Sequence, residues 1–180
     1  MIYVFLAQGF EEVEALAPID LLRRCEKEVI TVGVNDNIIV GSHNIPVVTD
    51  TVTQEVVLSD ELEMIVLPGG MPGTINLENN PVVQQAIDYC MKNNKYIGAI
   101  CAAPSILGHK GLLDGKDAVC FEGFESQLGN ANILDAPVAV DGNIITARGA
   151  GVAIQFALRL AEAVTSKERS DVLKASILCE

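Results

Sequence analysis

The sequence is poor in aromatic and basic residues. It contains no tryptophan and only two histidines, His43 and His109, and its 12 lysines and arginines stand against 24 aspartates and glutamates. The net charge of −12 argues against nucleic acid and anionic membranes as partners, because such phosphate-rich surfaces are bound through basic residues. Chemistry that depends on an imidazole base has only two candidate residues in this chain.

Long apolar segments and paired cysteines are also missing. No apolar run reaches the roughly 18 residues of a membrane-spanning helix, and Met1 leads into a strand pattern without a basic leader, so we expect neither a membrane span nor a signal peptide. The cysteines are odd in number and form no C-x-x-C pair, which argues against a disulfide framework or a zinc site. They fit a reducing cytoplasm and are Cys25, Cys90, Cys101, Cys120 and Cys179.

The 180 residues, 49% of them apolar, are enough for one well-packed domain spanning residues 1–180. Buried-strand patterns alternate with helical ones, which predicts an α/β fold with a mostly parallel sheet and helices on both faces. The predicted strands are 2–7, 28–34, 63–67, 96–100, 118–121 and a hairpin of 138–140 with 144–147, and a small antiparallel excursion covers 35–53. The predicted helices are 11–24, 81–93, 102–109, 152–164 and 167–174, with a short helix or loop at 124–132.

The stretch Tyr96–Ser105, YIGAICAAPS, is typical of a reactive residue on a tight turn between a strand and a helix. Cys101 follows the apolar run, and small residues stand two positions before it and two after it, at Ala99 and Ala103, as a strained turn requires. A thiol at the start of a helix is expected to ionise more readily than free cysteine, whose pKa is about 8.5. A buried packing cysteine is the alternative interpretation of this stretch alone.

Three loops are predicted to meet at one edge of the sheet, because ligands of parallel α/β sheets bind at the carboxyl ends of the strands. The first loop carries three glutamates (Glu11, Glu12 and Glu14), the second carries Gly69 and Gly70, and the third carries Cys101. A carboxyl group next to a thiolate is tolerable if it is protonated and donates a hydrogen bond to the sulfur. The backbone N–H groups of Gly70 and Ala102 are placed to face an oxyanion.

Four ordered motifs match a known group of proteins. They are G-x-E-E-x-E (9–14), V-L-P-G-G (66–70), A-I-C-A-x-P (99–104) and T-x-R-G-x-G (146–151). In these motifs, over essentially its whole length, the chain resembles the ThiJ/PfpI superfamily, and within it the Parkinson-disease deglycase/chaperone group with its bacterial YajL-like relatives.

The resemblance implies a flavodoxin-like three-layer α/β/α sandwich, similar to class I glutamine amidotransferases, and a homodimer without a cofactor or metal. It implies an oxidation-prone nucleophile at Cys101 with the protonated carboxyl of Glu14 next to it. Gly70 and Ala102 would supply the oxyanion N–H groups. Gly69, Arg148 and His43 are accessory candidates.

The chain departs from the family in its histidines. Relatives that act on glyoxals place a histidine near the cysteine, where Phe121 or Glu122 stands here, and protease-like relatives have one directly after it, where Ala102 stands. Proteolysis is therefore not expected. His109 is predicted to be a surface or packing residue, and Arg148 is better explained by a structural ion pair than by anion binding.

Two kinds of function remain open. The first is a stress-protective enzyme in which Cys101 and Glu14 act as a glyoxalase or deglycase on methylglyoxal or its adducts, with modest turnover. The second is a non-enzymatic redox sensor or chaperone in which an oxidant converts Cys101 to the sulfinic acid. A thiamine-pathway enzyme ranks below both, because no phosphate-binding loop is present.

Overall fold

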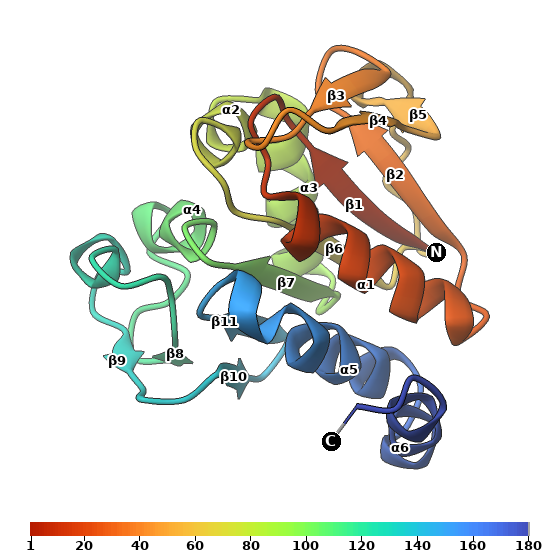
Figure 1. Ribbon diagram of the computed structural model, residues 1–180. Helices are drawn as coiled ribbons and strands as arrows, with labels where there is room; N and C mark the ends of the chain where they lie inside the picture. Colours follow the sequence, from red (N-terminus) through yellow and green to blue (C-terminus); the bar gives the residue numbers. More distant parts are fainter. Residues whose placement is uncertain (180) are drawn as a thin grey trace.

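The computed structural model describes residues 1–179 and is built around a seven-stranded sheet in the order β10-β11-β7-β6-β1-β2-β5 (Figure 1). All neighbouring strands are parallel except β10, which is antiparallel to β11. The five central strands, β2-β1-β6-β7-β11, have the strand order of flavodoxin-like folds. The strands are β1 (Ile2–Leu6), β2 (Val29–Gly33), β5 (Thr51–Val52), β6 (Met64–Leu67), β7 (Tyr96–Ile100), β10 (Val138–Asp141) and β11 (Ile144–Ala147).

Helices cover both faces of this sheet, and strand β1 shows why. All its residues are buried, and alternate side chains enter two separate cores. Ile2, Val4 and Leu6 belong to the core shared with α1 (Glu12–Arg24), α5 (Ala153–Val164) and α6 (Lys167–Ser176). Tyr3 and Phe5 belong to the core shared with α2 (Gly73–Glu78), α3 (Pro81–Lys92) and α4 (Pro104–His109). The predicted three-layer α/β/α arrangement is confirmed.

Most predicted elements are present with small shifts in their ends. Helix α1 runs through Pro18 and begins one residue later than predicted. The last long helix begins after a turn of 3-10 helix, η3 (Ala150–Val152). The antiparallel excursion is confirmed as a hairpin of β3 (Ile38–Val40) and β4 (Pro46–Val48).

Three parts of the secondary-structure prediction are wrong. Residues 51–53 do not belong to the antiparallel excursion, because β5 pairs with β2 in parallel and extends the main sheet, before the short 3-10 helix η1 (Thr53–Glu55). Helix α2 is absent from the predicted elements. Finally, β8 is Asp117–Ala118, shifted from 118–121, and it pairs with β9 (Asn132–Ile133) outside the main sheet. A short 3-10 helix, η2 (Glu125–Gln127), lies between them.

The strand order creates a crevice at one place. From β1 the chain moves outward to β2 on one side, and after β6 it moves outward to β7 and β11 on the other side. The connections therefore leave the sheet in opposite directions between β1 and β6, where α/β sheets bind their ligands at the carboxyl ends. The loops that follow β1, β6 and β7 carry the predicted site residues.

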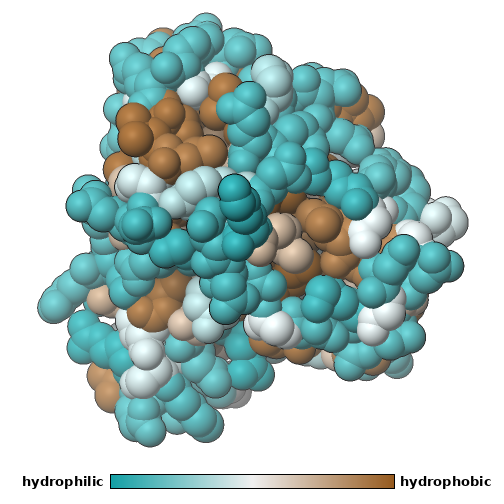
Figure 2. All heavy atoms as spheres, turned by 180° about the vertical axis from the view of Figure 1, so that it is seen from behind, coloured by the Kyte–Doolittle hydropathy of each residue, from teal (hydrophilic) through white to brown (hydrophobic). Residues whose placement is uncertain are grey.

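The surface is mainly hydrophilic, as the acidic composition predicts. Seen from behind the view of Figure 1, apolar residues form separate patches within a polar surface (Figure 2). Among the helices of the described chain, none combines the length and apolar character needed to cross a membrane.

Candidate active site

Cys101 lies on a strained turn at the end of β7. Its φ of 67° is in the left-handed region, which a residue with a side chain rarely adopts. The backbone is held from both sides, because its N–H donates to Ala147 O (2.9 Å) and its carbonyl accepts from Phe121 N (2.8 Å). Ala99 and Ala103 are fully buried, as the requirement for small neighbours predicts. The side chain of Cys101 is partly exposed and is positioned at the crevice.

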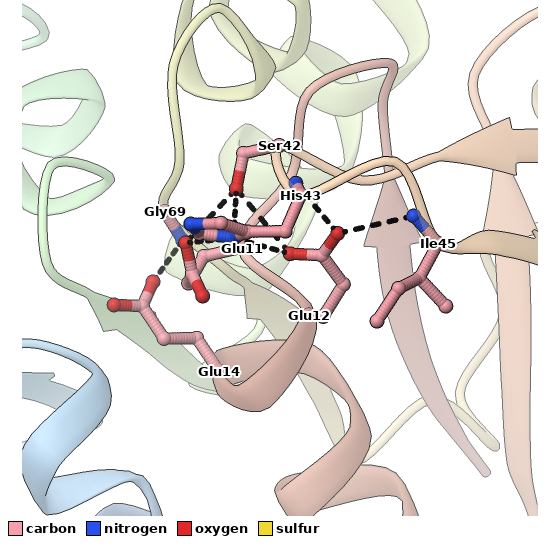
Figure 3. Close-up of polar contacts among 7 residues, drawn as sticks. All are labelled: Glu11, Glu12, Glu14, Ser42, His43, Ile45 and Gly69. Carbon is pink, nitrogen blue, oxygen red and sulfur yellow. Dashed lines mark hydrogen bonds and ion pairs between the residues drawn. The ribbon is translucent and has the colours of Figure 1, made fainter.

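Glu14 lies in the first turn of α1 and is almost completely buried, at 1% exposure. Its Oε2 accepts a hydrogen bond from Gly69 N at 2.9 Å, and the carboxyl group points from the helix toward that glycine (Figure 3). The carboxyl also hydrogen-bonds the Ala150 backbone N–H and the Cys101 thiol. The predicted thiol and carboxyl are therefore brought together, and among the three glutamates the structure places Glu14 next to the sulfur.

Gly69 allows this close approach. A Cβ atom at this position would lie 2.6 Å from Cys101 Cβ and 2.6 Å from Glu14 Oε2, distances too short for real contacts. Gly70 is required for a second reason, because its φ of 89° suits glycine. The V-L-P-G-G motif thus supplies a backbone thin enough to pass between the cysteine and the glutamate.

Burial sets the protonation of the pair. It raises the pKa of the Glu14 carboxyl to about 7, against the lowering effect of the hydrogen bonds from Cys101 and Gly69. Burial also raises the pKa of the Cys101 thiol to about 12, and the charge of Glu14 contributes to the rise. Between these values the pair holds one proton and one negative charge.

The sequence predicted a lowered pKa for Cys101, and this prediction is wrong. Beside an ionised Glu14 the pKa of the thiol is raised. The N-terminus of a helix lowers the pKa of a nearby thiol, but α4 is only six residues long and begins at Pro104. Burial of the sulfur raises its pKa and is the larger effect. Two backbone N–H groups, of Ala102 and Gly70, do hydrogen-bond the sulfur and favour its ionised form. They are the N–H groups predicted for an oxyanion, and that role stays a prediction.

Glu11 and Glu12 have different surroundings from Glu14. Glu12 is 4% exposed and binds the loop before β4. Its Oε1 accepts from His43 N at 2.8 Å and from Ile45 N at 3.5 Å, and its Oε2 lies 3.0 Å from His43 Nδ1 (Figure 3). Burial acts to raise the pKa of Glu12, but the hydrogen bonds outweigh it and hold the pKa below its usual range. Glu12 is therefore a structural anchor for this loop.

The accessory candidates are placed around this centre. The His43 ring is mostly exposed and contacts Glu12 and Glu11, and the hydrogen bond that it donates to Glu12 raises its pKa. His109 forms a surface pair with Glu78 at 2.6 Å, as predicted for a surface residue. Arg148 pairs with Asp135 at 3.1 Å, which confirms the predicted structural ion pair.

One group in the described chain has the composition of a metal site, namely Glu11, Glu12 and His43, whose ligand atoms lie within 4.8 Å of one another. Both oxygens of Glu12 are already occupied by hydrogen bonds from the loop at 42–45. Glu12 therefore serves this loop as a hydrogen-bond acceptor.

Sequence reasoning missed two contributors to the site. The Ala150 N–H donates to Glu14, and Gly149 lies against both Phe121 and Glu14, so that a Cβ there would be 3.3 Å from Phe121 Cδ2 and 3.8 Å from Glu14 Oε1. Both residues lie in the T-x-R-G-x-G motif. Its glycines were the available signal, but nothing local in the sequence shows that this turn reaches Glu14.

Comparisons with known proteins confirm the resemblance to the family. A comparison with protein families matches the DJ-1/PfpI family over residues 1–163. The protein dj-1beta of Drosophila melanogaster is 34% identical over 178 residues, which covers 97% of this chain and 95% of the relative. The chain belongs to the DJ-1/PfpI family. The predicted bacterial YajL-like subgroup stays a prediction.

Solved structures of the DJ-1/PfpI family agree with this fold. The crystal structure of Drosophila melanogaster DJ-1beta has a TM-score of 0.94 at 33% identity and covers 99% of this chain and 97% of that one. The structure of Schizosaccharomyces pombe DJ-1 has a TM-score of 0.89 at 30% identity, with 97% of both chains covered. A relative from Schizosaccharomyces pombe, named glutathione-independent glyoxalase DJ-1, is 30% identical over 184 residues. The match covers 97% of this chain and 96% of the relative.

Proposed function

We propose that this chain is a stress-protective, cysteine-dependent glyoxalase that converts 2-oxoaldehydes such as methylglyoxal, or their adducts, into 2-hydroxy acids. The observation that carries the proposal is the hydrogen-bonded pair of the Cys101 thiol and the Glu14 carboxyl, which holds one mobile proton near neutral pH. Relatives in Schizosaccharomyces pombe and Caenorhabditis elegans bear the name glutathione-independent glyoxalase, which supports this reaction class.

The reaction begins with the transfer of the thiol proton to Glu14 as the sulfur of Cys101 bonds to the aldehyde carbon. The N–H groups of Gly70 and Ala102 stabilise the oxygen, which takes the proton from Glu14 to complete a hemithioacetal and leaves Glu14 ionised. Glu14 then takes the C1 proton and returns it to C2, and the proton of the C1 hydroxyl passes to the C2 oxygen, so that C1 is oxidised to an acyl group and C2 is reduced to an alcohol. Water hydrolyses the thioester, releases the 2-hydroxy acid and restores the thiol.

Lactate formation from methylglyoxal tests the proposal. We expect purified protein to form lactate without glutathione, and Cys101→Ser and Glu14→Gln to lose at least about 100-fold in kcat/KM, since the first removes the nucleophile and the second removes the group that transfers the proton. Cys90→Ser is the matched control, because Cys90 is buried in the core on the α3 face. Equal rates for wild type and Cys101→Ser would exclude this function.

The pH dependence of kcat/KM follows from the raised pKa of Glu14. The active pair holds one proton and one charge, a state reached only when the first proton has left at about pH 7. We therefore expect kcat/KM to rise with pH through about 7 and then reach a plateau. A rate that falls over this range would contradict the proposed state of the pair.

Oxidation sensing is the second candidate. Cys101 is partly exposed, and the neighbouring N–H groups of Ala102 and Gly70 can hold a sulfinate. Each of two equivalents of peroxide would transfer one oxygen atom to the sulfur and leave as water. Mass spectrometry after mild peroxide should show two added oxygen atoms on Cys101 first, and earlier oxidation of Cys25 or Cys179 would count against this role.

We also propose that residues 1–180 form one domain that works as a cytoplasmic homodimer. Exposed apolar side chains gather on the N-terminal half of α1 and on the β3–β4 hairpin that Glu12 ties to it. They are Val13, Leu16, Ile38, Ile45 and Val48, with exposures between 40% and 71%. A surface of this kind favours association with a second copy. Cys25, Cys90, Cys101 and Cys120 are present as thiols, which fits a reducing compartment.

A further inference from the structure

A hollow of about 550 Å³ lies beside the Cys101–Glu14 pair. Its wall is formed by the turn between β11 and α5, by Phe121 and Glu122, and by residues 135–137. The cysteine and the glutamate do not line this hollow. No part of the proposed reaction uses it.

Several residues in the wall of the hollow contact the site. The backbone N–H of Phe121 donates a hydrogen bond to the backbone carbonyl oxygen of Cys101 at 2.8 Å. The Phe121 ring also lies beside Gly149, and Gly149 in turn lies beside Glu14 Oε1. Ala150, another wall residue, donates its N–H to Glu14. Three residues of the wall thus contact Cys101 or Glu14, directly or through Gly149.

The chemistry of the wall selects a neutral, apolar occupant. Its apolar members are Phe121, Ala136, Pro137, Ala150 and Val152, and half of the Phe121 side chain is exposed. Its charged members are exposed to solvent: the charge of Arg148 is balanced by Asp135 at 3.1 Å, and Glu122 adds a negative charge. No cation is left uncompensated for an anionic ligand in this part of the described chain.

The hollow is larger than the side chain of methylglyoxal requires. Pockets of about 300–1,000 Å³ hold drug-sized ligands, whereas methylglyoxal carries only a methyl group beyond its two carbonyls. An aromatic or branched aliphatic group would fill far more of this space and would contact the Phe121 ring.

We propose that this hollow binds the side chain of the substrate, and that the preferred substrates are 2-oxoaldehydes with an aromatic or branched apolar group. The inference rests on the proposed glyoxalase function. Phe121 is then a specificity-determining residue: it provides an apolar wall for the substrate side chain while the aldehyde carbon is bound at Cys101.

The test compares phenylglyoxal with methylglyoxal as substrates. Differences of one or a few carbon groups in an apolar pocket change kcat/KM by about 10–200-fold, so we expect wild type to prefer phenylglyoxal by at least about 10-fold. Phe121→Ala should lower kcat/KM for phenylglyoxal at least about 10-fold more than kcat/KM for methylglyoxal. Phe121→Leu should keep most of the preference. Initial rates are taken before arginine modification, which intact mass verifies.

Ile133→Ala is the matched control, because Ile133 is a similarly exposed apolar residue that borders a neighbouring hollow and not this one. It should leave the preference unchanged. Equal activity of wild type on both aldehydes, or an equal loss on both in Phe121→Ala, overturns the inference and leaves the glyoxalase function standing.

If neither aldehyde is turned over, a binding measurement tests the apolar subsite separately from the glyoxalase function. Acetophenone carries the aromatic ketone without the reactive aldehyde, and acetone serves as the small probe. We expect acetophenone, and not acetone, to shift the NMR signals of the Phe121, Gly149 and Ala150 amides in wild type and not in Phe121→Ala. Unmoved amides with acetophenone overturn the inference whatever the activity, whereas a selective shift without turnover supports the subsite and excludes the glyoxalase function.

Discussion

At the scale of single residues, the site depends on a carboxyl group that the fold holds partly protonated. Glu14 is buried, and the hydrogen bonds it receives do not fully offset the cost of its charge, so its pKa stands at about 7. A buried carboxyl with a raised pKa favours the folded state only while it is protonated. Burial of Glu14 therefore costs stability at neutral pH, and it gives the site a proton-transfer group whose pKa lies near 7.

The pH dependence of stability tests this balance. Between pH 4.5, the usual pKa of the carboxyl, and about 7, the native state binds more protons than the unfolded state. The free energy of unfolding of the wild type should therefore fall as pH rises through this window, by on the order of 3 kcal/mol. Glu14→Gln cannot titrate, so its stability relative to wild type should increase from pH 4.5 to pH 8.

Urea unfolding at pH 4.5, 6 and 8 measures this difference, with Glu28→Gln as the control because Glu28 is exposed. The control should follow the wild type at every pH. A constant difference between Glu14→Gln and wild type would show that the pKa of Glu14 is not raised.

Gly69 gives a second prediction at this scale. Gly69→Ala would place a methyl group 2.6 Å from both Cys101 Cβ and Glu14 Oε2, so one of the two side chains must move. We expect a loss of about 1–3 kcal/mol in the free energy of unfolding, as for other overpacked sites, together with a loss of lactate formation.

Gly151→Ala is the comparison, because no atom lies within 4 Å of a Cβ at that position and its φ is not in the left-handed region. Its effect on stability should stay within about 0.5 kcal/mol. Equal behaviour of the two variants in urea unfolding and in the lactate assay would remove the steric argument for Gly69.

At the scale of elements, the first turn of α1 serves two neighbouring structures at once. Because helical residues point in successive directions about 100° apart, Glu12 faces the loop before β4, while Glu14, two positions on, faces Gly69 at the end of β6 (Figure 3). The helix thus links the β3–β4 hairpin to the crevice.

Removal of the Glu12 anchor should loosen that hairpin. Glu12→Ala leaves the N–H groups of His43 and Ile45 without their acceptor, and we expect a loss of about 1–3 kcal/mol in the free energy of unfolding. Hydrogen exchange should become faster at these two amides. Glu28→Ala, an exposed substitution on the loop between α1 and β2, should change neither quantity. Unchanged exchange in Glu12→Ala would show that the anchor is dispensable.

The sequence predicted the elements of the central sheet because each of them is marked locally. Strand β7 has the predicted bounds, and β1, β6 and β11 agree within two residues, since continuous apolar runs mark buried parallel strands. The errors concern short elements. A two-residue strand such as β5 carries no period of its own, so its pairing with β2 depends on the position of the whole hairpin.

At the scale of the whole molecule, association of two copies is the main proposal. An apolar surface next to α1 and the β3–β4 hairpin is unusual in a chain with a net charge of −12, because charged residues otherwise keep the surface polar. An interface of about 1,200–2,000 Å² in total would suffice for a stable dimer.

Sedimentation velocity tests this surface. Val48 is 71% exposed on β4, and Val48→Glu should shift the chain from dimer to monomer, because a buried, unpaired charge opposes the interface. Val57→Glu, at 64% exposure after η1 and away from this surface, should leave the dimer intact. A monomeric wild type, or a dimer unaffected by Val48→Glu, would contradict the proposed interface.

The sequence by itself determined the turn that holds Cys101, because the requirements of that turn are local: an apolar strand, small residues on both sides and a short helix after it. The residues alone left three glutamates open, and the family motif pointed to Glu14. Only the tertiary structure placed Glu14 against Gly69 and Cys101, because that contact joins segments 55 or more positions apart in the chain. The raised pKa values and the hollow beside Phe121 were likewise decided by tertiary structure, since burial and cavity shape depend on how distant elements pack.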